Sequence, residues 1–282
     1  MFRIGTLADW FGVGLIEGIR ASEQCGATGV QIYAAGELHP DTTDASFLKK
    51  VRKTTLDCHQ TVTALCGELG GYGLEKPADN PKKLDYLKKV IALGEELDCH
   101  IVTTHIGVVP DSKEDPVYPV LLDAMGEIGL YAKAHGAVIA VETGPEAIRT
   151  LRGLLDEADV GVGINYDPAN LVMVGADDEV EGVLVGAERI VHTHAKDGFC
   201  RNRMSPKDFY HCFAEGGLEW AATAGCTEET PLGQGAVRWI PYLRALQQIG
   251  YDGYLTIERE VKNGADDIRM AVRFLNEVMQ KL

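Results

Sequence analysis

The chain alternates between short apolar runs rich in Val, Ile and Thr and longer stretches in which apolar residues recur every three or four positions. The first pattern predicts buried β-strands, and the second predicts amphipathic helices. We expect eight strands, at Phe2–Thr6, Gly29–Tyr33, Val62–Cys66, Ile101–His105, Val138–Glu142, Val162–Tyr166, Ile190–His194 and Gly253–Glu258.

Helical periodicity fills the gaps between these runs. One predicted helix face carries Leu84, Leu87 and Ile91, and the last predicted helix runs from Asp266 to Met279. Glycine, which is favoured just after helix C-termini, follows three of the predicted helices, at Gly26, Gly136 and Gly250.

Eight strand-then-helix units in 282 residues predict one α/β domain that spans residues 1–282. Eight parallel strands close into a (β/α)8 TIM barrel, and such barrels usually contain about 250 residues. An open doubly wound sheet is the competing architecture, but no glycine-rich phosphate-binding sequence follows the first strand. We therefore predict a closed TIM barrel.

The regular alternation is interrupted between residues 197 and 235. This segment has about 40 residues where a barrel loop usually has a few. Its Ser205-Pro206-Lys207-Asp208 sequence predicts the start of a helix, with Ser205 as the N-cap and Pro206 in the first turn. Because the segment follows a strand at its carboxyl end and is rich in aromatic residues, we expect it to form a lid or a partner surface.

The charge of the chain excludes several classes of partner. Its 27 Lys and Arg against 42 Asp and Glu give a formal net charge of −15. Nucleic acids and anionic membrane surfaces bind clustered basic residues, and no apolar run approaches the about 20 residues of a membrane span. We predict no nucleic-acid and no membrane partner.

The N-terminal sequence lacks an apolar segment of signal-peptide length, and the seven cysteines include no CxxC pair. We therefore expect reduced thiols and a cytoplasmic location.

Acidic and imidazole side chains stand at the ends of four successive predicted strands: Glu142, Asp167, His194 and Glu258. In TIM-barrel enzymes the reactive groups lie at the carboxyl ends of the strands, which meet at one rim. Three neighbouring carboxylates would repel one another, and a divalent cation removes this conflict. Mixed oxygen and nitrogen donors suit Mn, Mg, Co or Zn, so we predict that these four residues hold one divalent metal ion.

These strand ends, together with the His-Thr-His-Ala-Lys-Asp run from His192 to Asp197, resemble the xylose isomerase-like TIM-barrel superfamily. The resemblance covers essentially the whole chain. It is greatest to the sugar phosphate isomerase/epimerase group, which includes ketose 3-epimerases, inosose isomerase and inosose dehydratase. The run from Pro231 to Val237 also resembles the Pro-Gly-x-Gly turn of this group, with Leu232 inserted.

The resemblance implies that the four strand-end residues are metal ligands and that Glu142 and Glu258 also form the catalytic acid/base pair. We therefore expect a metal-dependent isomerase or epimerase whose partner is a small-molecule sugar, a ketose or sugar phosphate. The cation would bind adjacent carbonyl and hydroxyl oxygens while one glutamate removes the proton next to the carbonyl, giving a metal-bound cis-enediolate. Return of the proton to the same carbon or its neighbour gives epimerisation or isomerisation, respectively.

Three residues near other strand ends are predicted to contact the substrate. His105 ends the fourth strand and can hydrogen-bond to a hydroxyl group. Glu68 lies in the glycine-rich sequence after the third strand, where the backbone can approach a ligand. Trp10 follows the first strand and can stack on the apolar face of a sugar. Each of these residues also fits a purely structural or solvent-exposed position.

Three further substrate contacts follow from the resemblance. Asn170 stands where several epimerases have a substrate-binding histidine. Lys196 and Asp197 match dehydratase-like members of the group, and the arginine that epimerases have shortly after the metal-binding histidine has no counterpart in register. These departures favour a metal-dependent lyase or dehydratase as the alternative, because a lysine can stabilise a leaving hydroxyl or carboxylate group.

The sequence also leaves two more distant functions as alternatives, and it does not fix the oligomeric state. A non-catalytic sugar-binding barrel would lack one acid/base residue. An endonuclease of the same superfamily would need several more metal ligands at strands two to four, where only His39 is nearby. The aromatic residues of the 197–235 segment lead us to expect a homo-oligomer, a dimer or tetramer.

Overall fold

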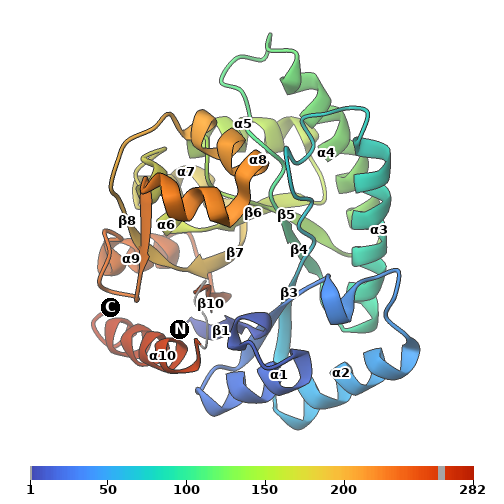
Figure 1. The fold of residues 1–282 in the computed structure, drawn as a ribbon, viewed down its shortest axis with the longest axis vertical. Coiled ribbons are helices and arrows are strands. Elements are labelled where there is room, and N and C mark those ends of the chain that lie inside the picture. Colours follow the sequence, from blue (N-terminus) through green and yellow to red (C-terminus); the bar gives the residue numbers. More distant parts are fainter. Residues whose placement is uncertain (1, 260–263) are drawn as a thin grey trace.

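The computed structural model describes residues 2–259 and 264–282, without the side chains of residues 218, 219 and 221–223. Its centre is a closed barrel of parallel strands in the order β1-β10-β7-β6-β5-β4-β3-β2 (Figure 1). The barrel strands are β1 (Arg3–Leu7), β2 (Gly29–Tyr33), β3 (Thr61–Cys66), β4 (Ile101–Thr104), β5 (Val138–Glu142), β6 (Val162–Tyr166), β7 (Ile190–Ala195) and β10 (Tyr254–Ile257).

Helices surround the barrel and bury the outward-facing apolar side chains of its strands (Figure 1). They are α1 (Leu15–Gln24), α2 (Ala45–Asp57), α3 (Asn80–Glu96), α4 (Val117–Ala134), α5 (Ile148–Ala158), α6 (Pro168–Val174), α7 (Glu181–Gly186), α9 (Trp239–Gln248) and α10 (Ala265–Met279), with short 3-10 turns at Ala8–Phe11, Gly36–Leu38 and Ala187–Arg189. No helix in the described part of the chain is long and apolar enough to cross a membrane.

The structure confirms the predicted TIM barrel, and each of the eight predicted strands overlaps a barrel strand. The bounds differ by one residue at several ends. The predicted fourth and eighth strands include His105 and Glu258, which lie just beyond β4 and β10. Gly26, Gly136 and Gly250 have φ values of +89°, +66° and +78° at the ends of α1, α4 and α9. This left-handed conformation explains why glycine follows these helices.

The segment of residues 197–235, which we call the lid segment, contains two strands in addition to the predicted helix. It consists of the antiparallel strands β8 (Asp197–Cys200) and β9 (Thr227–Thr230), with helix α8 (Pro206–Ala224) between them. The predicted N-cap is confirmed, because the Ser205 side chain accepts a hydrogen bond from the backbone N–H of Asp208. The two strands were not predicted. The Thr-Glu-Glu-Thr sequence of β9 has no apolar alternation, and the hairpin is held by backbone pairing.

Asp197 anchors the lid segment to the barrel. Its fully buried carboxylate accepts hydrogen bonds from the backbone N–H groups of Gly198, Gly233 and Val237, and from the indole N–H of Trp239. The Pro231–Val237 turn folds around this carboxylate. The structure therefore does not bring Asp197 to the cavity as the predicted substrate contact, and its four hydrogen bonds give it a structural role.

Replacing Asp197 with alanine is expected to destabilise the protein strongly. The D197A variant leaves several buried N–H donors without a partner, and each such donor costs about 1–3 kcal/mol. We expect the free energy of unfolding in urea to fall by about 3 kcal/mol or more. The exposed Asp123 of α4 provides the matched control, and D123A should change stability by less than about 0.5 kcal/mol. A D197A loss no larger than that of D123A would contradict the anchoring role.

Candidate metal centre and active site

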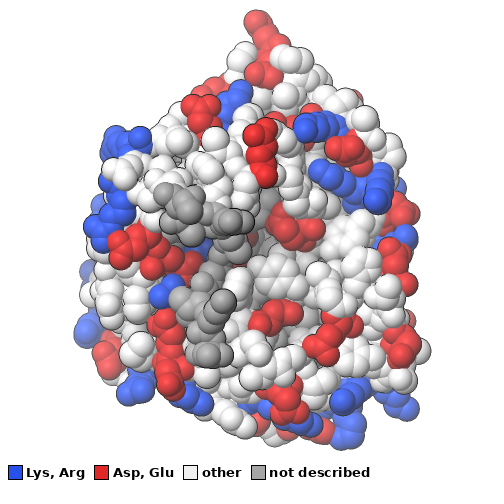
Figure 2. All heavy atoms as spheres, viewed as in Figure 1, with Lys and Arg blue, Asp and Glu red and all other residues white. Residues whose placement is uncertain are grey.

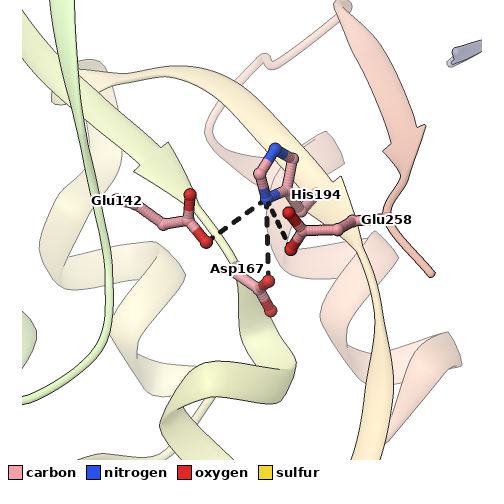
Figure 3. Close-up of side chains that lie close together, drawn as sticks. All are labelled: Glu142, Asp167, His194 and Glu258. Carbon is pink, nitrogen blue, oxygen red and sulfur yellow. Dashed lines mark ion pairs between the residues drawn. The ribbon is translucent and has the colours of Figure 1, made fainter. Parts of the chain in front are cut away.

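The four predicted metal ligands come together at the carboxyl ends of neighbouring strands. Glu142 ends β5, Asp167 follows β6, His194 lies in β7 and Glu258 follows β10. One ligand atom from each residue lies within 4.8 Å of the others, and all four side chains are buried. Nδ1 of His194 lies 3.4 Å from Glu142 Oε1, 3.7 Å from Asp167 Oδ2 and 3.3 Å from Glu258 Oε2 (Figure 3). We call these residues the quartet.

Two atoms of the quartet show that it fits a metal ion. Oδ2 of Asp167 and Nδ1 of His194 are buried and have no hydrogen-bond partner among the described residues. Burying such groups without a partner is costly. Both atoms face the centre of the quartet, where a cation would coordinate them (Figure 3). Three carboxylates and one imidazole match the donor preferences of Mn, Mg, Co or Zn.

Asp167 has two separate functions, one for each carboxylate oxygen. Oδ1 accepts hydrogen bonds from the backbone N–H groups of Ala169 and Asn170, at 2.8 and 3.1 Å, and so caps the N-terminus of α6. Oδ2 faces the quartet. The helix cap therefore fixes the orientation of the carboxylate and leaves one oxygen available as a ligand.

His194 is oriented by a buried glutamine on the opposite side of its ring. Its Nε2 lies 3.1 Å from Oε1 of Gln31 in β2, and the Gln31 amide donates to the hydroxyl of Thr103 in β4 at 3.2 Å. Asn165 Nδ2 lies 3.3 Å from the same nitrogen, and in the neutral tautomer that carries its proton on Nε2, His194 donates to the Gln31 oxygen. This arrangement leaves the Nδ1 lone pair for a metal ion.

Glu142 is held by two amide side chains. Asn165 donates to its Oε2 at 3.2 Å, and Asn170 donates to its Oε1 at 2.9 Å. Asn165 is itself positioned by His192, whose Nδ1 lies 2.8 Å from the Asn165 oxygen. Burial lowers the pKa of His192 well below its usual value, so His192 is neutral. The structure thus places Asn170 at the quartet, in direct contact with Glu142.

Glu258 is paired with a buried lysine. Nζ of Lys196 donates to Glu258 Oε2 at 3.0 Å and lies 3.9 Å from a carboxylate oxygen of Glu229 in β9. Burial opposes the ionisation of Glu258, but the charges of Lys196 and His194 outweigh it and hold the pKa of Glu258 well below its usual range. Glu258 is therefore ionised and able to accept a proton.

His105 and Glu68 form an ion pair on the wall beside the quartet. Nδ1 of His105 lies 2.9 Å from Glu68 Oε2, and its Nε2 lies 3.8 Å from Glu142 Oε1. Burial opposes protonation of His105, but the charges of Glu142 and Glu68 outweigh it and raise its pKa to about 10. The imidazolium can donate to a substrate oxygen.

A cavity of about 920 Å³ opens above the quartet. Five of the six predicted substrate contacts line it, namely Trp10, Glu68, His105, Asn170 and Lys196, whereas Asp197 does not. Helix α8 of the lid segment lies over the carboxyl ends of the strands (Figure 1). It supplies Tyr210 and His211 to the cavity wall. Nε2 of His211 lies 3.2 Å from a carboxylate oxygen of Glu75. The lid segment therefore contributes directly to the candidate active site.

The comparisons with known proteins agree with this fold and site. Residues 19–278 match the family model described as xylose isomerase-like TIM barrel. The chain belongs to the xylose isomerase-like TIM-barrel family. One similar structure is a xylose isomerase domain protein from Planctomyces limnophilus, which is 25% identical, with a TM-score of 0.80 over 99% of this chain and 97% of that chain.

Two further structures share the fold of the xylose isomerase-like family with this chain. The probable 3-DHS dehydratase AsbF from Bacillus anthracis is 17% identical, with a TM-score of 0.78 over 98% of this chain and 99% of that one. A D-psicose 3-epimerase crystallised in the presence of D-fructose is 14% identical, with a TM-score of 0.74 over 99% of both chains. The family fold thus occurs both in a sugar epimerase and in a probable dehydratase.

Sequence analysis missed two residues that position the quartet of this family member, Gln31 and Asn165. Each lies in the interior of a strand whose other residues are aliphatic, glycine or a terminal tyrosine, and each is buried. A buried polar side chain needs a hydrogen-bond partner inside the barrel. The polar residue within each predicted strand was visible in the sequence, but the sequence does not identify its hydrogen-bond partner.

The Gln31→Leu substitution is expected to weaken metal binding. Leucine keeps most of the volume of the side chain but cannot accept the proton of His194 Nε2, so the imidazole loses its fixed orientation. Removing such a supporting contact usually lowers metal affinity by about 10–100-fold. Calorimetric titration with Mn2+ measures the effect, and Q247L, at an exposed glutamine of α9, is the matched control. Equal affinities of Q31L and Q247L would show that Gln31 does not orient the ligand.

Proposed function

We propose that this protein is a divalent-metal-dependent isomerase or epimerase that acts on a sugar by proton transfer next to a carbonyl group. The observation that carries the proposal is the placement of two glutamates on opposite sides of one centre (Figure 3). A pair of carboxylates on opposite sides of a bound substrate can remove a proton from one face and deliver one to the other. Such a pair supports a catalytic site over a simple binding site.

The residues of the chain have distinct roles in the proposed reaction. A divalent ion held by the quartet would act as a Lewis acid and make the C–H bond next to a carbonyl group more acidic. Glu142 and Glu258 accept and return the proton. Asn170 and Lys196 hold these two carboxylates in place through direct hydrogen bonds. His105 donates a hydrogen bond to a substrate oxygen on the wall of the cavity.

A metal-dependent lyase is the second candidate, and Lys196 favours it. Its ammonium group lies on the cavity wall beside Glu258. An ammonium group in this position can donate a proton to a hydroxyl that leaves from the carbon next to the site of proton removal. The same first step, removal of a C–H proton by a glutamate, then leads to loss of water.

Deuterium exchange tests the proposal and separates the two candidates. The Mn2+-loaded protein is incubated in D2O with ketoses, inososes and their phosphates, and C–H signals are followed by proton NMR. We expect exchange at the carbon next to the carbonyl of at least one compound, together with an epimer or isomer. A product that has lost water identifies the lyase instead. No exchange with any compound, while metal binding is demonstrated, contradicts both candidates and favours a non-catalytic barrel.

Two observations support a small-molecule enzyme over a nuclease of the same superfamily. Among the described residues, a single group of His, Cys, Asp and Glu side chains is arranged to hold a metal, and it is the quartet. The net charge of −15 opposes binding to a phosphate backbone. Cleavage of DNA that contains an abasic site would contradict this assignment.

A further inference from the structure

The cavity above the quartet is several times larger than one sugar ring. Its volume is about 920 Å³, whereas a hexose has about 12 non-hydrogen atoms and occupies roughly 200 Å³ at the packing density of organic crystals. Ligand sites usually enclose most of the ligand surface. A single ring at the quartet would therefore leave most of the cavity unfilled.

Several aromatic side chains line the cavity. Trp10 and Tyr33 approach from the β1 and β2 ends, with ring centroids 6.5 Å apart, and Tyr72 approaches from the loop after β3. Across the cavity, α8 supplies Phe209 and Phe213, and Phe213 is 37% exposed at the rim. Aromatic rings bury large apolar areas. The aromatic side chains of the cavity can pack against the apolar faces of a second sugar ring.

The charged residues of the cavity disfavour an anionic ligand. In addition to Glu142 and Glu258 of the quartet, the carboxylates of Asp9, Glu37, Glu68, Glu75 and Glu229 line it. Lys196 is the single Lys or Arg among the described lining residues, and it is paired with Glu258 and Glu229. The described residues around the hollow near the centre of Figure 2 are mostly neutral (white) and acidic (red). A phosphate group recognised by the protein usually meets arginine, lysine or a helix N-terminus.

We propose that the substrate is an uncharged compound of two linked rings, a glycoside or disaccharide, with its keto sugar ring at the quartet and its second ring among the aromatic side chains. The inference rests on the proposed function for the position of the keto ring. The cavity is large enough for a second ring, and its aromatic side chains can pack against that ring. Its carboxylates repel phosphate esters and carboxylates. Trp10 and Phe213 contact the second ring from opposite sides.

A matched set of three ketones tests this inference. They are a disaccharide with a ketone next to a hydroxyl group on one ring, the corresponding keto monosaccharide, and the phosphate ester of that monosaccharide. The Mn2+-loaded protein is incubated with each in D2O, and kcat/KM for C–H exchange is determined by NMR. We expect kcat/KM for the disaccharide to exceed that for the monosaccharide at least tenfold, with the phosphate ester lowest. Equal values for one and two rings, or preference for the phosphate, overturn the inference.

Substitution of the two aromatic residues tests the position of the second ring. In F213A and W10A we expect the ratio of disaccharide to monosaccharide kcat/KM to fall about tenfold, through a higher KM for the disaccharide. The control is L184A, because Leu184 of α7 is also 37% exposed but does not line the cavity, and this variant should keep the wild-type ratio. An unchanged ratio in both F213A and W10A overturns the proposed contact.

Binding measurements distinguish failure of this inference from failure of the proposed function. If neither the three ketones nor the ketoses, inososes and phosphates tested above show exchange, the proposed reaction is wrong, and calorimetry with the unoxidised disaccharide and monosaccharide still tests the second ring. At least tenfold tighter binding of the disaccharide, lost in F213A, supports the two-ring site without the reaction. Equal affinity, or no binding of the disaccharide, overturns it.

Discussion

The Glu258→Gln variant is expected to lose turnover by about 10²–10⁴-fold while it remains folded, because a positioned general base contributes an effect of this size. Glutamine has nearly the same shape as glutamate but cannot accept a proton. Among the described residues, Glu229 lies 3.9 Å from Nζ of Lys196 and can still pair with it in the variant. The measurement is the rate of C–H exchange in D2O at a Mn2+ concentration that saturates the variant, so that weaker metal binding does not cause the loss.

The matched control for E258Q is E228Q. Glu228 lies in β9 next to Glu229, and its side chain is exposed and paired with Arg201. The substitution changes the net charge by the same amount at an exposed position outside the quartet. We expect E228Q to retain activity within about twofold, as is usual for surface substitutions. If metal-saturated E258Q keeps more than a tenth of the wild-type rate, Glu258 is not a catalytic base.

Glu142 provides a sharper test of the two-carboxylate arrangement. If Glu142 and Glu258 act on opposite faces of the substrate, each single glutamine variant removes the base for one face only. E142Q and E258Q should then retain C–H exchange for opposite epimers, while interconversion of the epimers is lost in both. Loss of exchange for the same epimer in both variants would place the two carboxylates on one face and would contradict an epimerase.

The barrel and the quartet were predictable from sequence because both depend on local patterns and one rule of geometry. Parallel strands that are buried on both faces appear as continuous apolar runs, as in Val138–Glu142. A closed parallel barrel brings the carboxyl ends of all its strands to the same rim. Polar residues that end successive strands must therefore lie close together, even though Glu142 and Glu258 are far apart in the chain.

The role of Asp197 was not predictable because its partners are distant in sequence. Its carboxylate contacts Gly233, Val237 and Trp239, which lie 36, 40 and 42 residues further along the chain. An aspartate after a strand has the same sequence pattern whether it faces a ligand cavity or a set of backbone amides. The direction of the side chain depends on how the lid segment folds back, and this depends on backbone pairing between β8 and β9.

Metal removal and restoration test the quartet itself. In the metal-free protein, burial opposes protonation of His194, but the charges of Glu258 and Glu142 outweigh it and raise the pKa of His194 well above its usual value. His194 therefore holds a proton at neutral pH that a metal ion must displace. We expect Mn2+ binding to release about one proton, and metal affinity to fall as the pH is lowered. Calorimetric titration in buffers with different ionisation enthalpies measures the released proton.

The same metal ion should also stabilise the fold. At a free Mn2+ concentration of about 100 times the dissociation constant, binding contributes about 2.7 kcal/mol. This corresponds to a rise in Tm of roughly 5–10 °C for a domain of this size.

The H194A variant should lose both the proton release and the rise in Tm. The control variant H100A, at an exposed histidine outside the quartet, should keep both. A wild-type Tm that does not respond to Mn2+, Mg2+, Co2+ or Zn2+ would show that the quartet holds no divalent ion. The partnerless Asp167 and His194 atoms would then need another explanation, because a buried carboxylate and imidazole without partners are costly to maintain.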